Sequence, residues 1–316
     1  MKPKILFLDT THPILYDKLK ELGFELVFEF EKTKNELLEY LPQFDGIIIR
    51  SRMKIDKEII EKSLKLKFIG RVGSGLENID TEYAHSKGIH CINSPEGNRD
   101  AVAEHAIGML LCLNNNILKS DREVRNGLWL REENRGVEIS GKTIGIIGFG
   151  NMGSAFAQRL KGFDCSIIAY DKYKADYAPD YVRETDMNEI FEKADIVSYH
   201  IPYNQETHYL ISENHFQKFE KPIIIINTSR GKILKTEDLV SAIDHEKVKG
   251  ACLDVLEYES VSLQNLNKTE WPKAMTKLAN MNNVVLSSHI AGWTHESNIK
   301  LSLFLVEKIR QALNIL

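Results

Sequence analysis

The sequence predicts an α/β fold with two parallel sheets, and three observations support that prediction. Its short apolar runs are continuous rather than alternating, which is typical of strands that are covered on both faces. Amphipathic stretches separate these runs, as expected when βαβ units build a parallel sheet. About ten strands is more than one open sheet of ordinary size contains, so two sheets are expected.

The predicted strands fall into two groups, on either side of a long helical stretch at Asp100–Asn126. The first group is KILFL, ELVF, GIII, KFIG and GIHCI, and the second is TIGIIG, SIIAY, DIVSYH, PIIIIN and NVVLSSH. Helical stretches such as HPILYDKLKELG, KEIIEKSLKL and TEDLVSAIDHEK lie between the strands. A final helix is predicted over Glu296–Leu316, and 260–283 lacks a clear pattern apart from a short helix around Trp271–Leu278.

Length and composition limit the class of protein. A chain of 316 residues is expected to form about two domains. A net charge of −4 argues against a nucleic-acid or anionic-membrane partner, and we predict neither. The four cysteines occur singly, without a CxxC pair, so we predict no disulfide framework and no metal site. Because no apolar run approaches the ~18 residues of a membrane span, we expect a soluble, cytoplasmic protein.

A glycine loop follows the strand TIGIIG and opens a helix. Gly148, Gly150 and Gly153 form the pattern GxGxxG, and the next strand, SIIAY, ends in Asp171. Gly148 permits a tight turn, Gly150 lets the backbone approach a pyrophosphate, and Gly153 lets helix and strand pack closely. The helix N-terminus favours phosphate, and an acidic residue at 171 suits a ribose diol and repels a 2′-phosphate. The pattern therefore predicts NAD as the cofactor and favours it over NADP.

A methyltransferase that uses S-adenosylmethionine also has a glycine loop and an acidic residue after the second strand. Three later segments distinguish the alternatives, because each places a polar group at a strand end, where ligands bind in open α/β sheets. IIIINTSRG ends near Arg230, GACLDVLEYE carries Asp254 and Glu259, and NVVLSSH ends in His289. A methyltransferase would not need these groups.

In this order, the segments resemble the D-isomer-specific 2-hydroxyacid dehydrogenases from Gly70 to Trp293. The matching elements are GRVGSGLENID, NSPEGNRDAVAEHAIGMLL, NGLWLREENRGVEISGKTIGIIGFGNMG, HIPYNQETHYLI, INTSRG, ACLDVLEYE and SSHIAGW. The sequence departs from the usual family pattern at three positions, with serine in place of proline at Ser260 and Ser288 and tyrosine in place of leucine at Tyr203.

The resemblance implies roles for individual residues. Arg230 would orient a 2-hydroxy or 2-oxo acid through its bidentate guanidinium. His289 would move the hydroxyl proton, and Glu259 would hold its ring and favour its charged form. The loop Gly73-Ser74-Gly75 would bind the substrate carboxylate. The implied cofactor-binding residues are Gly148, Gly150, Asn151, Met152, Gly153, Asp171, His200, Pro202, Thr228 and Asp254.

The resemblance also implies the domain layout. An NAD-binding Rossmann domain at 100–289 would be inserted into a flavodoxin-like, substrate-binding domain formed by 1–99 and 290–316. The segment around Trp129 and Arg131 would lie in an arm that pairs subunits, so a homodimer is implied. The sequence ends at Leu316, directly after the final predicted helix, so we expect no C-terminal regulatory domain and no serine feedback through one.

Two arginines follow the strand GIII, in the segment Arg50-Ser51-Arg52. A solvated loop would explain them, but the family layout places this loop at the active site, with Arg71 nearby. A phosphorylated 2-hydroxy acid would need such a cluster of charge-assisted hydrogen bonds. The RSR segment resembles 3-phosphoglycerate dehydrogenases, which oxidise 3-phospho-D-glycerate in serine biosynthesis.

Two other hypotheses stay open at this stage. A hydroxypyruvate or glyoxylate reductase would perform the same chemistry on an unphosphorylated acid. A non-catalytic NAD-sensing interaction protein would need only the nucleotide site, so the presence of Arg230, Glu259 and His289 together argues against it.

Overall fold

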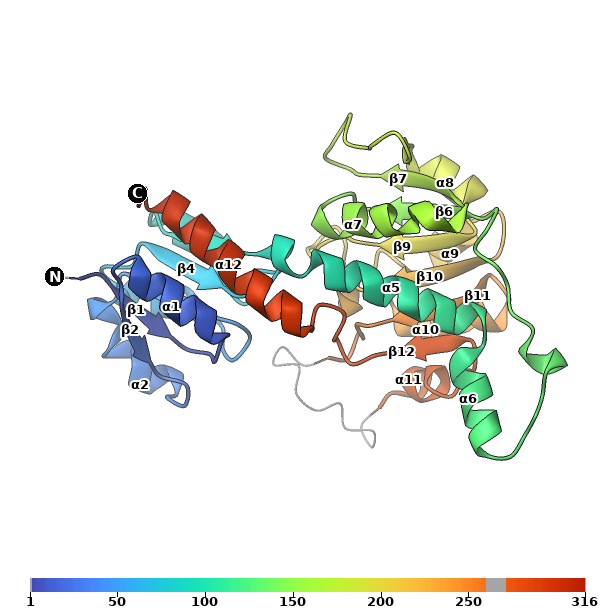
Figure 1. Cartoon of the computed structure of the whole chain (residues 1–316), viewed down its shortest axis with the longest axis horizontal. Coiled ribbons are helices and arrows are strands. Elements are labelled where there is room, and N and C mark those ends of the chain that lie inside the picture. The colour runs from blue at the N-terminus through green and yellow to red at the C-terminus, as the bar shows by residue number, and fades with distance from the viewer. Residues whose placement is uncertain (1, 260–270, 316) are drawn as a thin grey trace. The chain divides into compact units, whose positions relative to one another are not determined.

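The computed structural model describes residues 2–259 and 271–315, and these residues divide into two compact units. The first unit contains 2–99 and 293–315, and the second contains 100–259 and 271–292. Ser260 and the rest of the unpatterned stretch before Trp271 lie outside the described residues. Both units are α/β, with all strand pairs parallel, as the apolar runs predict. Figure 1 labels their helices and strands.

The first unit has a five-stranded sheet in the order β2-β1-β3-β4-β5. Its strands are β1 (Lys4–Phe7), β2 (Glu25–Phe28), β3 (Gly46–Ile49), β4 (Phe68–Arg71) and β5 (His90–Asn93). Its helices are α1 (Pro13–Glu21), α2 (Lys34–Leu38), α3 (Lys57–Lys62), α4 (Thr81–Ser86) and α12 (His295–Ala312). This is the flavodoxin-like strand order, in which the topological switch point lies between β1 and β3.

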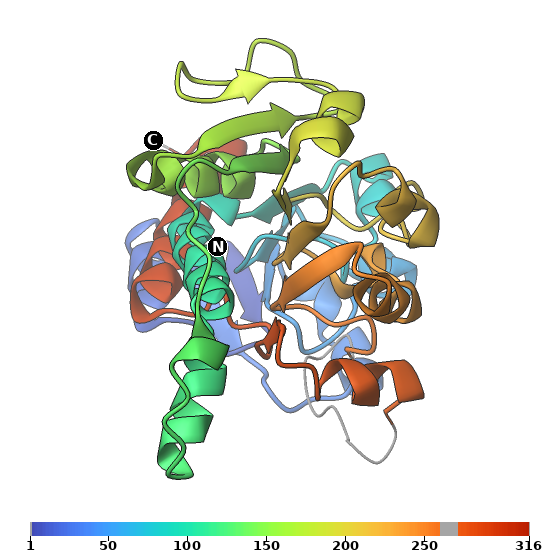
Figure 2. The same ribbon diagram turned by 90° about the vertical axis from the view of Figure 1, so that its right-hand side faces the viewer.

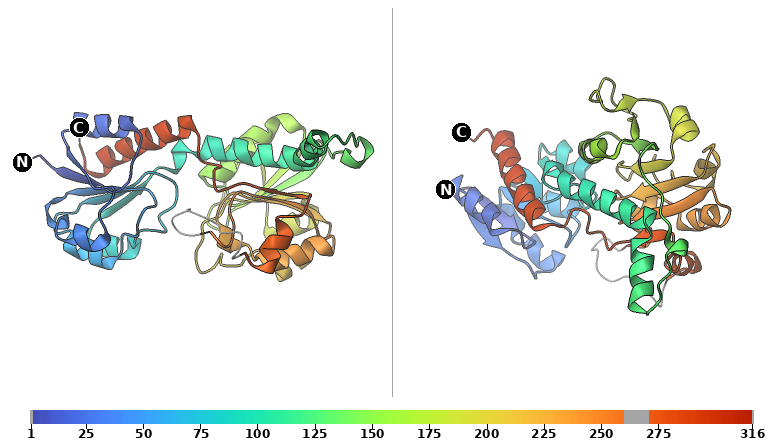
Figure 3. Two further views of the ribbon diagram at one scale, coloured as in Figure 1. Left: turned by 90° about the horizontal axis from the view of Figure 1, so that it is seen from below. Right: turned by 45° about the vertical axis from the view of Figure 1, so that its right-hand side comes forward.

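Two helices from opposite ends of the chain cover one face of this sheet. The left panel of Figure 3 shows α12 beside α1 on that face, while α2, α3 and α4 lie on the other. Leu301, Leu305 and Ile309 of α12 pack in one hydrophobic cluster with Leu15 and Leu19 of α1. Because a capping box at Thr294 and Ser297 starts α12, the final helix begins at His295, one residue before the predicted Glu296.

The second unit has a seven-stranded sheet in the order β12-β11-β10-β9-β6-β7-β8. Its strands are β6 (Thr143–Ile147), β7 (Ser166–Tyr170), β8 (Arg183–Glu184), β9 (Ile196–Tyr199), β10 (Ile223–Asn227), β11 (Val248–Leu253) and β12 (Val284–Leu286). Its helices are α5 (Arg99–Asn114), α6 (Ile117–Arg125), α7 (Asn151–Leu160), α8 (Met187–Lys193), α9 (Glu213–Gln217), α10 (Thr236–Asp244) and α11 (Lys273–Leu278). This is the Rossmann order with one further strand, and its switch point lies between β6 and β9.

Helices cover both faces of the second sheet, as Figure 2 shows. On one face, Leu110 of α5 and Phe156 of α7 belong to a buried cluster with Ile144 of β6. On the other face, Phe216 of α9 and Leu239 of α10 pack in a second cluster. The continuous apolar strands therefore have the two-sided burial that their pattern predicts.

The prediction of one helix over Asp100–Asn126 is wrong. α5 ends at Asn114 and α6 begins at Ile117, because Asn116 has a φ of 51° in the left-handed region, which ends an α-helix. None of the α6 side chains is buried, and Figure 2 shows α6 projecting from its unit together with the loop that follows. The apolar pattern alone does not reveal this break.

Candidate active site

The glycine loop lies at the switch point of the second sheet, between β6 and α7. Gly148 has a φ of 90°, a conformation that glycine adopts without strain, and its N–H donates to the carbonyl of Tyr170 at 2.8 Å. A Cβ atom at this position would lie 2.5 Å from the carbonyl oxygen of His200, which follows β9. The loop therefore requires glycine at 148, because the backbones of both switch-point strands approach each other here.

The other two glycines of the loop differ in their surroundings. A Cβ atom on Gly153 would lie 2.1 Å from the carbonyl oxygen of Gly148, so helix and loop pack too closely for a side chain. A Cβ atom on Gly150 would have no neighbour within 4 Å. Gly150 caps α7 without a side-chain hydrogen bond, and Asn151 and Met152 form the first turn, whose N–H groups suit a phosphate.

Asp171 follows β7 and holds the glycine loop in place. One carboxylate oxygen accepts from the N–H of Phe149 at 2.8 Å, and the other accepts from the N–H of Tyr173 at 3.0 Å. These two bonds leave lone pairs on both oxygens, since an ionised carboxylate accepts at about four sites. Asp171 is thus fixed beside the loop with acceptor capacity for a ribose diol.

Two predicted cofactor residues have a buried polar atom without a hydrogen-bond partner among the described residues. These atoms are Nδ1 of His200 and Oγ1 of Thr228. Pro202, another predicted cofactor-binding residue, is exposed. The other ring nitrogen of His200, Nε2, lies 2.8 Å from Ser198 Oγ, and burial lowers the pKa of His200 to about 4. Buried polar groups are normally paired. The glycine cradle and these two atoms therefore fit a bound dinucleotide.

Asn227 organises the turn that presents Arg230 after β10. Its buried side chain accepts from the N–H and the hydroxyl of Ser229 at 3.1 and 2.8 Å, and donates to the carbonyl of Arg230 at 3.0 Å. The Arg230 guanidinium donates to the Ser229 carbonyl at 2.6 Å. The turn is therefore fixed by side-chain hydrogen bonds, and sequence analysis missed the part that Asn227 plays in it.

The three predicted catalytic residues lie on three loops, which follow β10, β11 and β12. A Cβ atom on Gly231, next to Arg230, would lie 1.9 Å from the carbonyl oxygen of Leu256, so the two loops are in close contact. The N–H of Leu256 donates to Glu259 Oε1, and Glu259 Oε2 lies 2.6 Å from Nδ1 of His289. A continuous set of contacts thus links the Arg230 turn to the carboxylate–imidazole pair.

His289 has a φ of 57°, an uncommon backbone conformation for a residue other than glycine. Its N–H donates to the carbonyl of Asp254 at 2.7 Å, which fixes the turn. The His289 side chain is 30% exposed and that of Glu259 only 18%, so the imidazole is the more accessible member of the pair. Because Nδ1 contacts Glu259, Nε2 is the nitrogen left to meet a substrate.

Asp254 is 1% exposed and supports the loop that carries His289. Its carboxylate accepts from the hydroxyl of Ser287 at 2.6 Å and from the N–H groups of Ile290 and Ala291, both at 2.9 Å. Burial favours a raised pKa for Asp254, but the hydrogen bonds from His105 and Ser287 and from the two backbone groups outweigh it and lower the pKa. The structure thus gives Asp254 a supporting role within the loop.

His105 and Ser287 are further members of this cluster that sequence analysis missed. Nε2 of His105 lies 2.9 Å from Ser287 Oγ and 3.4 Å from Asp254 Oδ1. His105 lies in the segment AEHAIGMLL, where only its polar character within an apolar helix could have indicated a buried partner.

In the first unit, Arg50 lies at the end of β3, at the switch point with β1. Its N–H donates to Asp9 at 2.6 Å, and its guanidinium makes a long hydrogen bond of 3.4 Å to the carbonyl of Thr10. The guanidinium carbon lies 4.3 Å from the ring centroid of Trp293, a cation–π contact. Arg50 is therefore oriented by the ring face and retains N–H groups for a ligand.

Arg52 is held differently from Arg50. Its two terminal nitrogens donate to the carbonyls of Lys32 at 2.9 Å and Glu29 at 3.2 Å, which ties its loop to the segment after β2. Ser51 lies between the two arginines and is half-buried. Nε of Arg71, at the end of β4, donates to the carbonyl of Arg50 at 3.3 Å. The structure thus links Arg71 to the backbone of Arg50, whereas the Arg52 guanidinium bonds to the segment after β2.

The loop Gly73-Ser74-Gly75 follows β4 and is fixed by two asparagines. Ser74 Oγ donates to Asn98 at 2.7 Å, and the Asn93 side chain donates to the Ser74 carbonyl at 2.5 Å. A Cβ atom on Gly73 would lie 1.8 Å from Nη1 of Arg71, so the guanidinium packs directly on the glycine. All the predicted substrate residues of the first unit therefore gather at the carboxyl ends of β3 and β4.

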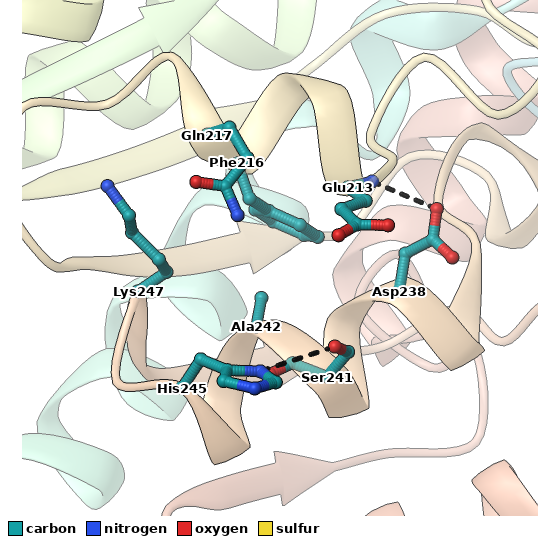
Figure 4. A pocket seen from close by; sticks show the side chains of 8 residues that line it. All are labelled: Glu213, Phe216, Gln217, Asp238, Ser241, Ala242, His245 and Lys247. Carbon is teal, nitrogen blue, oxygen red and sulfur yellow. Dashed lines mark hydrogen bonds between the residues drawn. The ribbon is translucent and has the colours of Figure 1, made fainter.

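A separate cavity of about 220 Å³ lies between α9 and α10, and none of the predicted site residues lines it (Figure 4). Two hydrogen bonds cross or border it, from the N–H of Glu213 to Asp238 and between His245 and the Ser241 carbonyl.

No group of three potential metal ligands occurs among residues 2–259 and 271–315. Within the same ranges, every helix is too short or too polar to cross a membrane.

Comparisons with known proteins agree with this geometry. Residues 107–291 match the family model described as the D-isomer specific 2-hydroxyacid dehydrogenase, NAD binding domain. A D-3-phosphoglycerate dehydrogenase of Archaeoglobus fulgidus is 33% identical over 97% of this chain and 56% of its own length. A hydroxypyruvate reductase of Thermotoga maritima is 36% identical over 89% of both chains. The chain thus spans little more than half the length of the phosphoglycerate dehydrogenases that it matches.

The fold is also found in a solved structure of an acyclic imino acid reductase in complex with NADPH and D-Arg. That structure has a TM-score of 0.84, is 29% identical, and covers 98% of this chain and 97% of its own. The family model covers more than half of the chain and includes the glycine loop, Arg230, Glu259 and His289. The chain therefore belongs to the D-isomer specific 2-hydroxyacid dehydrogenase family, with NAD as its cofactor and its NAD-binding domain in the second unit.

Proposed function

We propose that the chain is an oxidoreductase that transfers a hydride between NAD and C2 of a D-2-hydroxy acid. The observation that carries this proposal is the 2.6 Å contact between His289 Nδ1 and Glu259 Oε2. The pair adjoins the Arg230 turn, in the same unit as the glycine loop. A nucleotide-binding protein without a reaction would not need an oriented acid/base beside an arginine.

Each residue has a defined task in this reaction. The Arg230 guanidinium binds the carboxylate and the C2 oxygen of the substrate and fixes the orientation of C2. In the oxidation, His289 Nε2 accepts the proton of the C2 hydroxyl, and in the reduction it returns that proton to the C2 oxygen. Glu259 stabilises the resulting imidazolium and holds the ring. NAD, when bound, supplies the acceptor or donor of the hydride.

The substrate that we propose is 3-phospho-D-glycerate, with 3-phosphohydroxypyruvate as its oxidised form, in serine biosynthesis. Arg50 supports this proposal, because among residues 2–259 and 271–315 its guanidinium makes one long hydrogen bond, to the Thr10 carbonyl, and keeps further N–H groups for a ligand. A phosphate at the far end of the substrate would accept from such a group in a charge-assisted hydrogen bond. Several of the relatives carry the name D-3-phosphoglycerate dehydrogenase.

Arg52 favours a second candidate, the reduction of hydroxypyruvate or glyoxylate. Both of its terminal nitrogens already donate to backbone carbonyls, so it has fewer N–H groups for a phosphate than the sequence suggests. The Thermotoga maritima relative that shares 89% of its length with this chain is named a hydroxypyruvate reductase. The two candidates share their catalytic residues and differ only in the far end of the substrate.

Turnover of NADH with 3-phosphohydroxypyruvate, hydroxypyruvate and glyoxylate tests both candidates. We expect the phosphorylated acid to have the largest kcat/KM. A wide preference for hydroxypyruvate would replace the first candidate by the second. Failure of all three acids to oxidise NADH, although the protein binds the dinucleotide, would overturn the proposed reaction.

We also propose that two copies of the chain pair through the segment of α6 and the following loop. The supporting observation is a group of exposed apolar side chains, which a monomer would leave in water. They are Ile117, Leu118, Val124, Leu128, Trp129, Leu130 and Val137. Light scattering should show a dimer, and Trp129→Glu, at a side chain that is 77% exposed, should weaken it without unfolding the unit.

The compartment that we propose is the cytoplasm. All four cysteines are free, and burial raises the pKa of Cys91 to about 11, so that this thiol stays protonated and unreactive. Free thiols of this kind suit a reducing compartment. Cell fractionation with an antibody to the chain would test the assignment.

A further inference from the structure

A second carboxylate lies close to Asp171, on the nucleotide side of the second unit. Glu206 Oε2 lies 2.7 Å from the Lys172 ammonium and accepts from the hydroxyl of Tyr173 at 2.9 Å. Both partners directly follow Asp171 in the chain, whereas Glu206 comes from the loop after β9. Lys172, which follows Asp171 in the sequence, is thus already paired with the Glu206 carboxylate from another loop.

The loop that carries Glu206 is fixed by a set of short-range hydrogen bonds. The Asn204 side chain accepts from the N–H groups of Glu206 and Thr207 at 2.9 and 3.0 Å. Thr207 Oγ1 accepts from the N–H of Asn204 at 2.8 Å and donates to the Pro202 carbonyl at 2.7 Å. Such a turn presents Glu206 in a defined position, although the carboxylate itself is exposed.

The other lysine near Asp171 is also engaged. Lys174 Nζ donates to the carbonyl of Phe149, in the glycine loop, at 2.8 Å. Asp171 accepts from the N–H of the same residue. The two lysines that could attract a 2′-phosphate are therefore bonded elsewhere, one to the glycine-loop backbone and one to Glu206.

We propose that Glu206 is a second specificity-determining residue, which pairs with Lys172 and thereby excludes dinucleotides that carry a 2′-phosphate. An acidic residue at the position of Asp171 binds the ribose diol and repels a 2′-phosphate. A free lysine at the next residue, Lys172, would offset that repulsion by attracting the phosphate. Glu206 removes this offset, because it engages the Lys172 ammonium at 2.7 Å.

The proposal rests on the NAD site and is independent of the substrate proposed above. It is tested by isothermal titration of the whole chain with NADH and NADPH, and with 5′-AMP and 2′,5′-ADP as fragments, so that no turnover is needed. Glu206→Gln should raise the affinity for NADPH and 2′,5′-ADP by about fivefold, because it frees the Lys172 ammonium for the 2′-phosphate. Affinity for NADH and 5′-AMP should change less than about twofold, since Glu206 makes no bond to the diol in this scheme.

Two further variants determine whether Lys172 carries the effect. The double variant Glu206→Gln with Lys172→Ala should lose the gain for NADPH. Asp244→Asn, which removes an exposed carboxylate paired with Lys277 in the same unit, should leave both affinities unchanged. An unchanged ratio of NADPH to NADH affinity in Glu206→Gln would overturn the proposal. So would a gain that persists after Lys172 is removed.

Discussion

The strand-end residues of the two units are held in different ways. In the second unit, functional side chains contact one another or close a loop, as in the pairs Glu259–His289 and Asp254–Ser287. In the first unit, the Arg50 and Arg52 guanidiniums donate to backbone carbonyls, as Arg52 does to Glu29. In a network of hydrogen-bonded charged side chains, removing any one side chain leaves its partners unpaired. Among the described residues, the Arg50 and Arg52 guanidiniums share no hydrogen bond with another charged side chain, so loss of one of them should have a smaller effect.

His289→Asn should break the second-unit network with the largest effect. The variant removes the acid/base group but keeps a small polar side chain, so kcat should fall by about 10²–10⁴-fold, the usual contribution of such a group. NADH affinity should stay within about twofold, because the glycine loop is unchanged. Stopped-flow turnover and NADH titration on the same sample measure both. A fall of less than tenfold would show that another group moves the proton.

Asp254→Asn should destabilise the second unit, because the buried carboxylate accepts two backbone N–H groups and a hydroxyl. An asparagine amide would place its own N–H₂ against one of these donors. Leaving such a group unpaired should cost about 1–3 kcal/mol in the free energy of unfolding. Urea unfolding followed by circular dichroism measures the loss. Ser287→Ala, which removes one neutral donor, is the milder comparison, and an equal loss in both variants would contradict the role given to Asp254.

Much of the second unit could be predicted from sequence, because its signals are local. Continuous apolar strands and the spacing of Gly148, Gly150 and Gly153 gave the fold class and the cofactor, which the structure and the family model confirm. The break at Asn116 and the supporting role of Asn227 could not be predicted. Each depends on a backbone conformation or on a partner that the local pattern does not specify.

The same limit applies to charge partners. Arg52 and Arg50 look equivalent in the sequence, but Arg52 bonds to carbonyls at positions 29 and 32, beyond another strand and helix. Likewise, Lys172 is predicted near Asp171 by adjacency, whereas its partner Glu206 lies on the loop after β9. A sequence places a charge on a strand end, but the partner that neutralises it comes from tertiary structure.

Acid should weaken the second unit through His215 of α9. Burial lowers the pKa of His215 to about 4, from 6.5 in an exposed histidine, and Nε2 lies 2.9 Å from the Tyr199 hydroxyl. Between pH 6.5 and 4 the unfolded chain binds the proton and the folded chain does not, so stability falls as pH falls through this window. The loss should approach about 3 kcal/mol at pH 4.

His215→Gln keeps a hydrogen-bonding side chain but cannot titrate, so its unfolding free energy should depend less on pH in this window. Tyr199→Phe removes the partner and keeps the imidazole, so its pH dependence should persist. Urea unfolding at several pH values compares the three proteins. Identical slopes in the wild type and the glutamine variant would show that other groups, such as His200, whose pKa burial also lowers, cause the acid sensitivity.

The two arginines of the first unit should respond differently to truncation. Arg50→Ala should raise the KM for 3-phosphohydroxypyruvate by about 10–100-fold, as expected for loss of one or two charge-assisted hydrogen bonds. Arg52→Ala should mainly lower the melting temperature, since its guanidinium connects two loops. Steady-state kinetics with the phosphorylated and unphosphorylated acids separate the two effects. An equal rise of KM for hydroxypyruvate in Arg50→Ala would contradict phosphate recognition by this residue.

Trp293→Leu should have the smallest effect and should reveal how the first unit orients its cation. The ring lies 4.3 Å from the Arg50 guanidinium and is 66% exposed, so the contact should contribute about 0.5–1 kcal/mol. KM for 3-phosphohydroxypyruvate should therefore rise about two- to fivefold at unchanged kcat, whereas Trp293→Phe should retain most of the affinity. In the Arg50→Ala background, Trp293→Leu should have no further effect on KM, because the ring acts through the guanidinium. An additive rise would mean that Trp293 contacts the substrate itself, and the first unit would then bind its ligand through apolar surface as well as charge.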